Sequence, residues 1–178
     1  MQYRRAFVPG GSFFFTVVTD GRRPLLASQE AVEVLRNAFR VVRDKHHFDV
    51  DAIVVLPDHL HCIWTLPRDE TDFAIRWQLI KTWFTKHCAP GLRPLANHAG
   101  VAKRGPAIWQ QRYWEHLLRD EPDFTRHAEY IHYNPVKHGY ATSPIEWPYS
   151  SFRRYVEAGT YSSDWGRGMI EFEDVGRE

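Results

Sequence analysis

The sequence predicts an α+β fold built on an antiparallel sheet, and three observations support this. A run of aromatic and β-branched residues, FFFTVVT, lies near the amino terminus and is typical of a strand. Two further apolar runs meet at a Pro-Asp turn in the middle of the chain, which indicates a hairpin. Two stretches with helical spacing of apolar residues follow the first strand and the hairpin. The resulting order, β-α-β-β-α-β with one more helix after it, is the ferredoxin-like order.

The first half of the chain supplies the first strand, a helix and the hairpin. Residues 13–19 form the strand, and Ser28 can cap a helix that continues to about Lys45. Residues 50–56 and 60–66 are the two hairpin strands. Because side chains alternate along a strand, Leu60, Cys62, Trp64 and Leu66 face one way and the intervening residues face the other. The apolar face should pack on the helices.

The second half supplies a helix, a strand and a late helix. Residues 72–87 form the helix, 89–106 a loop rich in Pro and Gly, and 109–118 a strand or extended segment. Asp120 with the residues after it is a strong helix start, because Pro stands in the first turn and acidic side chains stand at the positive end. We expect Pro135 to end this late helix.

Length and composition indicate one domain over residues 1–160, followed by a polar tail over 161–178. A net charge of only +1 excludes a chain that coats duplex DNA, so a nucleic-acid site must be a local basic patch. The aromatic content of 15% suits base stacking. Two cysteines make no disulfide framework, and no apolar run could span a membrane, so we expect a cytoplasmic protein.

His59 and His61 are the first candidate site residues. They are two positions apart on a predicted strand, so both project from its other face. That face should be open or covered only by the late helix. Two imidazoles on one face form half of a metal site. A pair of hydrogen-bonded strand histidines explains the spacing equally well.

Tyr130 and Asn134 are the second pair of candidates. They stand one helical turn apart on the same face of the late helix. An Asn carbonyl is a hard ligand that suits Mg²⁺ or Mn²⁺ beside imidazole, and the tyrosine would then lie near the ion. Tyr133 is the rival nucleophile, but the residue one turn after it is Lys137, beyond the proline. Alternatively, Tyr130 is a half-buried helix tyrosine and Asn134 a C-terminal cap.

Four stretches in order resemble one known family: GGSFFFTVVT, VVLPDHLHCIWTLP, WQQRYWEHLLRDE and YIHYNPVKHG. They are similar to the REP-associated tyrosine transposases, a branch of the single-tyrosine HUH transposases, and the resemblance extends from about residue 3 to 165. It implies that His59 and His61 are the HUH histidines, that Tyr130 is the nucleophile and that Asn134 is the third metal ligand.

The resemblance implies a metal-dependent transposase and endonuclease, with Mg²⁺ or Mn²⁺ as cofactor. It would cleave and rejoin single-stranded DNA at extragenic palindromic hairpins through a 5′-phosphotyrosine, as a nucleoid-associated monomer or homodimer. The covalent ester conserves the bond energy, so no ATP motif is needed. Two alternatives are a hairpin-binding protein without cleavage and a His-x-His phosphoesterase. A zinc site built from Cys62, Cys88 and His87 is disfavoured, because no paired-cysteine spacing exists.

Four basic residues are candidates for DNA contacts: Arg4, Arg5, Lys81 and Arg104. The family resemblance supports the amino-terminal pair more than Lys81. Lys81 belongs to the polar side of the second helix together with Arg76 and Lys86, and a solvated face is the default interpretation of those charges. The loop over 89–105 is longer than the resemblance leads us to expect.

Overall fold

The computed structural model describes residues 8–90, 107–172 and 175 of the chain. Its centre is an antiparallel sheet of four strands in the order β2-β3-β1-β4. The strands are β1 (Ser12–Val18), β2 (Asp49–Val55), β3 (His59–Thr65) and β4 (Trp114–Leu117). The first and third strands therefore lie in the middle of the sheet, and the predicted ferredoxin-like fold is confirmed.

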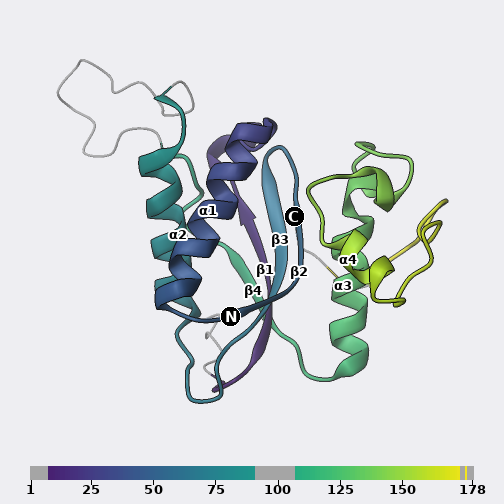
Figure 1. Cartoon of the computed structure of the whole chain (residues 1–178), viewed down its shortest axis with the longest axis horizontal. Coiled ribbons are helices and arrows are strands. Elements are labelled where there is room, and N and C mark those ends of the chain that lie inside the picture. Colours follow the sequence, from purple (N-terminus) through teal and green to yellow (C-terminus); the bar gives the residue numbers. More distant parts are fainter. Residues whose placement is uncertain (1–7, 91–106, 173–174, 176–178) are drawn as a thin grey trace.

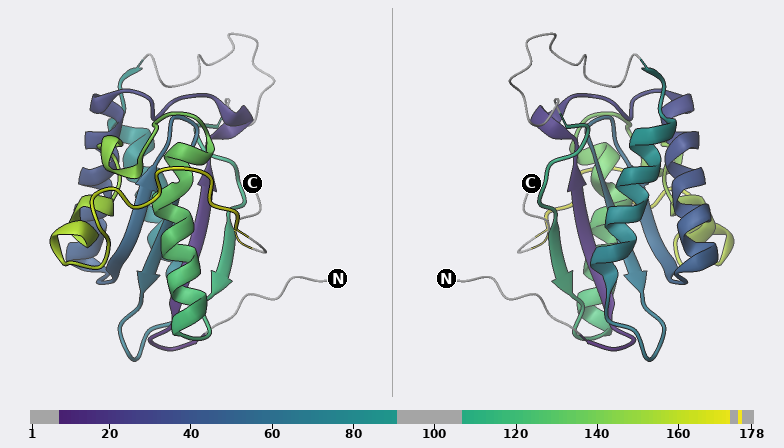
Figure 2. Two further views of the ribbon diagram at one scale, coloured as in Figure 1. Left: turned by 90° about the vertical axis from the view of Figure 1, so that its right-hand side faces the viewer. Right: turned by 90° about the vertical axis from the view of Figure 1, so that its left-hand side faces the viewer.

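Helices cover both faces of the sheet (Figures 1 and 2). One face carries α1 (Gln29–Lys45) and α2 (Phe73–His87), and the other carries α3 (Glu121–Lys137) and the short α4 (Phe152–Glu157). Two 3-10 turns, η1 (Asp20–Arg22) and η3 (Pro144–Glu146), lie in the connections. Among the described residues, none of the helices has the length and apolar character needed to cross a membrane.

Each face of the sheet has its own apolar core, because side chains alternate along the strands. Under α1 and α2 the core contains Leu60, Cys62 and Trp64, and Trp64 stacks on Trp77 of α2 at 4.2 Å. Under α3 the core joins Phe14, Ala52, Val54 and Ile63 to Ala128, Tyr130 and Ile131. Both face predictions are therefore confirmed, and the histidine face is covered by the late helix.

The ends of α3 follow from its local sequence. The Asp120 carboxylate accepts a hydrogen bond from the N–H of Asp123 at 2.8 Å, which caps the first turn. The prediction that Pro135 ends the helix is wrong, because α3 continues to Lys137. A proline lacks only its own N–H donor, and the turn after Pro135 closes normally. The N–H of His138 donates to the Asn134 carbonyl at 3.0 Å. Gly139, with a φ of +72°, then turns the chain away.

One segment and one side chain differ from the prediction. Of residues 109–118 only the last part pairs as β4, while Trp109 forms an isolated bridge with Thr19. Arg76 is buried rather than solvated. Its guanidinium donates to the backbone carbonyls of Asp72 and His47 at 2.6 and 2.8 Å. The approach of these carbonyls to Arg76 depends on the tertiary fold, so the sequence pattern does not predict it.

Candidate active site

His59 and His61 project from β3 into the layer between the sheet and α3, and both are buried. Nδ1 of His59 lies 2.6 Å from the Asp58 carboxylate, and Nδ1 of His61 lies 2.9 Å from the Thr16 hydroxyl. The rings are therefore oriented through Nδ1, and Nε2 is the nitrogen that each would offer to an ion. Histidines that bind metals are commonly held in this way, so the hydrogen bonds fit both interpretations of the pair.

Asp58 is itself held in a charged state. Partial burial alone would raise its pKa, but the contacts with His59 and Arg22 outweigh that effect, so the pKa of Asp58 is lowered. The Arg22 guanidinium donates to this carboxylate at 3.1 Å. A carboxylate that stays ionised keeps a hydrogen on Nδ1 of His59, which leaves Nε2 as the basic nitrogen of the ring.

Residues from α3 meet this pair from the opposite side. The ring of Tyr130 lies 5.3 Å from that of His61, and the ring of His138 lies 5.1 Å from that of His59. The two histidine rings are 4.9 Å apart. Asn134 stands one turn after Tyr130 and one turn before His138, and it is fully buried. The structure therefore brings Tyr130 to the two histidines, and Asn134 lies on the same face of α3, between two residues whose rings approach those histidines.

The environments of the two α3 residues differ in detail from the structural alternatives considered for them. Tyr130 is only 1% exposed rather than half-buried, and the residue at the C-cap is His138 rather than Asn134. The rival Tyr133 is engaged elsewhere. Its hydroxyl donates to the Gly168 carbonyl at 2.7 Å and accepts from the N–H of Ile170 at 3.1 Å.

Sequence reasoning missed Lys137. Its ammonium donates to the Tyr130 hydroxyl at 2.9 Å and lies 4.8 Å from the centre of the ring. The miss follows from the expected helix end at Pro135, because Lys137 was placed outside the helix. A spacing of seven residues within one helix would have put it on the same face as Tyr130.

The polar tail also reaches this region. The ring of Phe172 lies 5.6 Å from the rings of both Tyr130 and Tyr133, edge-on to the first. Together with the bonds from Tyr133 to Gly168 and Ile170, this contact seats the described part of the tail against α3.

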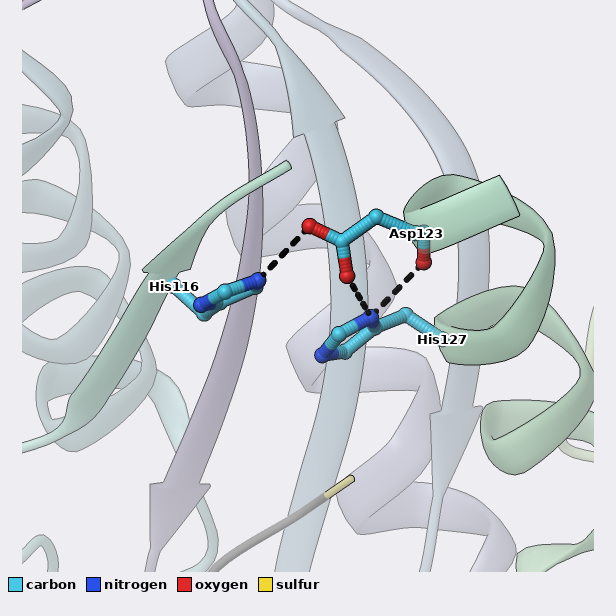
Figure 3. Close-up of side chains that lie close together, drawn as sticks. All are labelled: His116, Asp123 and His127. Carbon is cyan, nitrogen blue, oxygen red and sulfur yellow. Dashed lines mark hydrogen bonds and ion pairs between the residues drawn. The ribbon is translucent and has the colours of Figure 1, made fainter. Parts of the chain in front are cut away.

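A second polar cluster, also missed, joins β4 to α3: His116, Asp123 and His127 (Figure 3). Their ligand atoms lie within 4.8 Å of one another, and two imidazoles with a carboxylate are a donor set that can hold a metal ion. The Asp123 carboxylate lies 2.9 Å from Nε2 of His116 and 3.1 Å from Nδ1 of His127. The spacing of Asp123 and His127 by one turn was the available signal.

Hydrogen bonds join the three members of this cluster, whereas Nε2 of His127 has no hydrogen-bond partner among the described residues. Nδ1 of His127 donates to the Asp123 carbonyl at 2.8 Å, so it carries a hydrogen. Burial alone would raise the pKa of Asp123, but the bonds from His116 and from the N–H of Arg119 outweigh burial and lower the pKa. The cluster thus acts as a polar link between β4 and the first turn of α3.

The predicted DNA contacts are placed only in part. Arg4, Arg5 and Arg104 lie outside the described residues. The Lys81 ammonium donates to the Gln110 carbonyl at 3.0 Å and lies 5.2 Å from the Tyr113 ring, and burial lowers its pKa to about 8. Lys81 therefore links α2 to the segment before β4, rather than extending from a solvated face.

The disfavoured zinc site has no counterpart in the described part of the chain. Cys62 and Cys88 are buried in the core beneath α1 and α2, and burial raises the pKa of the Cys62 thiol well above its ordinary value. Nδ1 of His87 lies 2.7 Å from the Trp83 carbonyl of its own helix.

Comparison with known proteins shows which family the chain belongs to. No protein-family model matches it. The REP-associated tyrosine transposase of Escherichia coli K12 is 41% identical over 171 residues, which cover 96% of this chain and 94% of that protein. A Haemophilus influenzae protein carrying the same family name is 42% identical over 164 residues, 92% of each chain.

A solved structure agrees with these relatives. The REP-associated tyrosine transposase bound to a REP hairpin has a TM-score of 0.80 and 40% identity to this chain, and the match covers 100% of this chain and 98% of that one. Identity of this size over nearly the full length of each relative shows common descent rather than a shared fold alone. The chain belongs to the REP-associated tyrosine transposases.

Proposed function

We propose that this protein cleaves and rejoins single-stranded DNA beside palindromic hairpins, with Tyr130 as the nucleophile. The observation that carries the proposal is the 5.3 Å approach of the Tyr130 ring to that of His61, in a buried layer that also holds His59 and Asn134. The relative whose structure includes a REP hairpin supplies the class of substrate. The family name indicates a DNA-processing enzyme.

The reaction is a transfer of one phosphodiester bond. The Tyr130 oxygen bonds to phosphorus, the bond from phosphorus to the 3′-oxygen breaks, and a free 3′-OH strand leaves while a 5′-phosphotyrosine remains. The phenol gives up its proton and the leaving 3′-oxygen gains one, so the step needs no redox partner. Reversal by a 3′-OH strand rejoins the DNA. The α3 backbone holds Tyr130 in place for in-line attack, which tolerates little misalignment.

The donor set fits a hard divalent ion. His59, His61 and Asn134 would hold Mg²⁺ or Mn²⁺, using two imidazoles oriented through Nδ1 and one amide oxygen. When bound, such an ion polarises a phosphate oxygen and stabilises the negative charge that develops on it. Asp58 and Thr16 serve as the residues that orient the two rings.

The test of this proposal uses labelled single-stranded hairpin DNA with Mn²⁺ and a denaturing gel. We expect the wild type to give a cleaved strand and a protein–DNA adduct. His59→Ala and His61→Ala should lose both products, by at least about 10²-fold, because the charge on the phosphate is no longer stabilised. Hairpin affinity should stay close to that of the wild type.

The matched control is His47→Ala, since the His47 side chain is 65% exposed and lies outside the site. It should leave cleavage unchanged. Full cleavage by the double variant His59→Ala/His61→Ala would refute the assignment of these ligands. Hairpin binding by the wild type without cleavage in any divalent ion would favour the binding-only alternative.

Hairpin binding should weaken as salt rises, because contacts with phosphates release counterions. We expect log Kd to change with log salt concentration by roughly one unit per phosphate contact. The double variant Arg4→Ala/Arg5→Ala should lower this slope by about two units, whereas Lys45→Ala should not change it. An affinity that is the same in low and high salt would contradict the prediction, and titration by fluorescence anisotropy measures it.

A further inference from the structure

We propose that Lys137 is a catalytic residue, whose ammonium group holds the Tyr130 oxygen in place and stabilises the negative charge on it. This inference rests on the proposed function, because it assigns a role to a partner of the proposed nucleophile. Three features carry it: the position of Lys137 on α3, its two contacts with Tyr130, and the kind of charge that the reaction places on the phenol oxygen.

The position is set by the helix. Lys137 is the last residue of α3 and stands two turns after Tyr130, on the same face. Only the continuation of the helix past Pro135 brings it there. A basic side chain at this end of a helix is favoured by the helix dipole, which needs no contact with any other side chain. The contact with Tyr130 is therefore an additional feature that the dipole does not explain.

The contacts are specific. The Lys137 side chain is exposed in general, yet its ammonium donates to the hydroxyl of Tyr130, a residue that is only 1% exposed. Nζ lies 2.9 Å from the hydroxyl oxygen and 4.8 Å from the ring centre. Ordering a lysine side chain costs rotamer freedom, so a lysine without a partner would extend into water. The ammonium thus lies beside the hydroxyl oxygen of Tyr130, which is the atom that would bond to phosphorus.

The chemistry at that edge favours a cation. As the Tyr130 oxygen bonds to phosphorus it loses its proton, and when the 3′-OH strand attacks in the rejoining step the phenol oxygen leaves with a negative charge. A charged hydrogen bond to that oxygen is stronger than the same bond to a neutral phenol, so it stabilises the transition states of both steps. Lys137 keeps its own proton throughout and acts by its charge.

The expected size of the effect follows from similar donors. Hydrogen bonds to charged groups contribute enough to change a rate by roughly 10–100-fold, and a preorganised donor on a developing oxyanion contributes up to about 10³-fold. Because Lys137 is partly open to solvent, we expect the lower range. The substitution should act on formation of the adduct and on rejoining, and not on hairpin affinity.

The experiment compares Lys137→Met, Lys137→Gln and Lys137→Arg with the wild type. The first two keep much of the side-chain bulk and remove the charge, and the third restores a charged donor. Lys45→Met is the control, since Lys45 is an exposed lysine at the end of α1. Three quantities are measured: the single-turnover rate of adduct formation at saturating hairpin DNA with Mn²⁺, the hairpin Kd, and the Tm. Rejoining is measured by adding excess 3′-OH strand to the isolated adduct.

We expect Lys137→Met and Lys137→Gln to slow adduct formation and rejoining by roughly 10–100-fold, with Kd and Tm close to wild type, and Lys137→Arg to recover most of the rate. If the wild type forms the adduct and the uncharged variants form it as fast, the role of Lys137 is refuted while the proposed function stands. A loss that appears in Kd instead of in the rate would make Lys137 a DNA contact and overturn the inference. If Lys137→Arg is as slow as Lys137→Met and both have a lower Tm, the role is packing. No adduct from the wild type would refute the proposed function itself.

Discussion

Tyr130→Phe is expected to bind hairpin DNA as the wild type does, to cleave none of it and to form no adduct that survives denaturation. The change removes one oxygen atom from a ring that packs against His61 and Phe14. Those ring contacts remain, so the core beneath α3 should keep its shape. The hydrogen bond to Lys137 is lost, but because that lysine is largely exposed to water the loss of stability should be small. Activity, in contrast, should fall below detection, because no other atom takes the place of the nucleophile.

Tyr133→Phe is the matched control, because it removes the same atom from a tyrosine three residues later in the same helix. Its hydroxyl bonds to Gly168 and Ile170 of the tail, so the substitution loosens the tail but leaves the proposed nucleophile intact. We expect this variant to cleave and to form the adduct. Mass spectrometry of the wild-type adduct should find the nucleotide on the peptide that contains Tyr130. A nucleotide attached to Tyr133 would show that the one-turn spacing from Asn134 was the wrong guide.

Much of this site could be predicted because its residues follow simple periodicities. His59 and His61 share a strand face, and the strand around them is apolar on both sides, so burial and orientation follow from alternation alone. Tyr130 and Asn134 share a helix face for the same kind of reason. The two pairs meet because α3 packs on the histidine face of the sheet. That face also carries apolar residues such as Phe14 and Ile63, which need a helix to cover them.

The missed residues depend on contacts that no local period encodes. Lys137 was excluded because Pro135 was expected to stop the helix, although one missing N–H does not prevent the next turn from closing. Arg76 was assigned to a solvated face, but three-dimensional folding brings backbone carbonyls of Asp72 and His47 to its guanidinium. The cluster of His116 and Asp123 forms across β4 and α3, and its geometry depends on the turn between them.

His132 makes the second large prediction: the protein should lose stability steeply as the pH falls below about 6.5. This side chain is fully buried, with Nε2 at 2.9 Å from the Ser151 hydroxyl and with the rings of Tyr155 and Phe152 at 4.5 and 5.7 Å. The same hydroxyl accepts from the N–H of Ile53 in β2, so His132 belongs to the link between α3, α4 and the sheet edge. Burial lowers the pKa of His132 to about 3, and the positive charge of Arg154 acts in the same direction.

The sign follows from proton binding in the two states. An unfolded histidine has a pKa of about 6.5, so between about pH 6.5 and pH 3 the unfolded chain binds a proton that the folded chain does not. The stabilising contribution is complete above pH 6.5 and is lost progressively below it, by on the order of 2 kcal/mol at pH 5. Protonation inside the fold is unfavourable because it would place a hydrogen on Nδ1, which has no hydrogen-bond partner among the described residues. Burial also lowers the pKa of His127, which adds to the loss in the same direction.

Urea denaturation at pH 7.5, 6.5, 5.5 and 5.0 measures this loss. His132→Phe replaces the ring by one of similar shape among aromatic neighbours, so it gives up the bond to Ser151, about 1 kcal/mol at pH 7.5. Its free energy of unfolding should then fall much less between pH 6.5 and 5 than that of the wild type. His47→Asn, at an exposed histidine, should keep the wild-type pH dependence. Equal slopes for the wild type and His132→Phe would mean that other groups, such as His127, carry the acid sensitivity. The pKa of Asp58 and of Asp123 is lowered, so the stability that these charges contribute is lost below the ordinary carboxyl range and not in this window. Burial raises the pKa of Asp51 and of Glu129, so the difference between the wild type and His132→Phe, rather than the window alone, isolates His132.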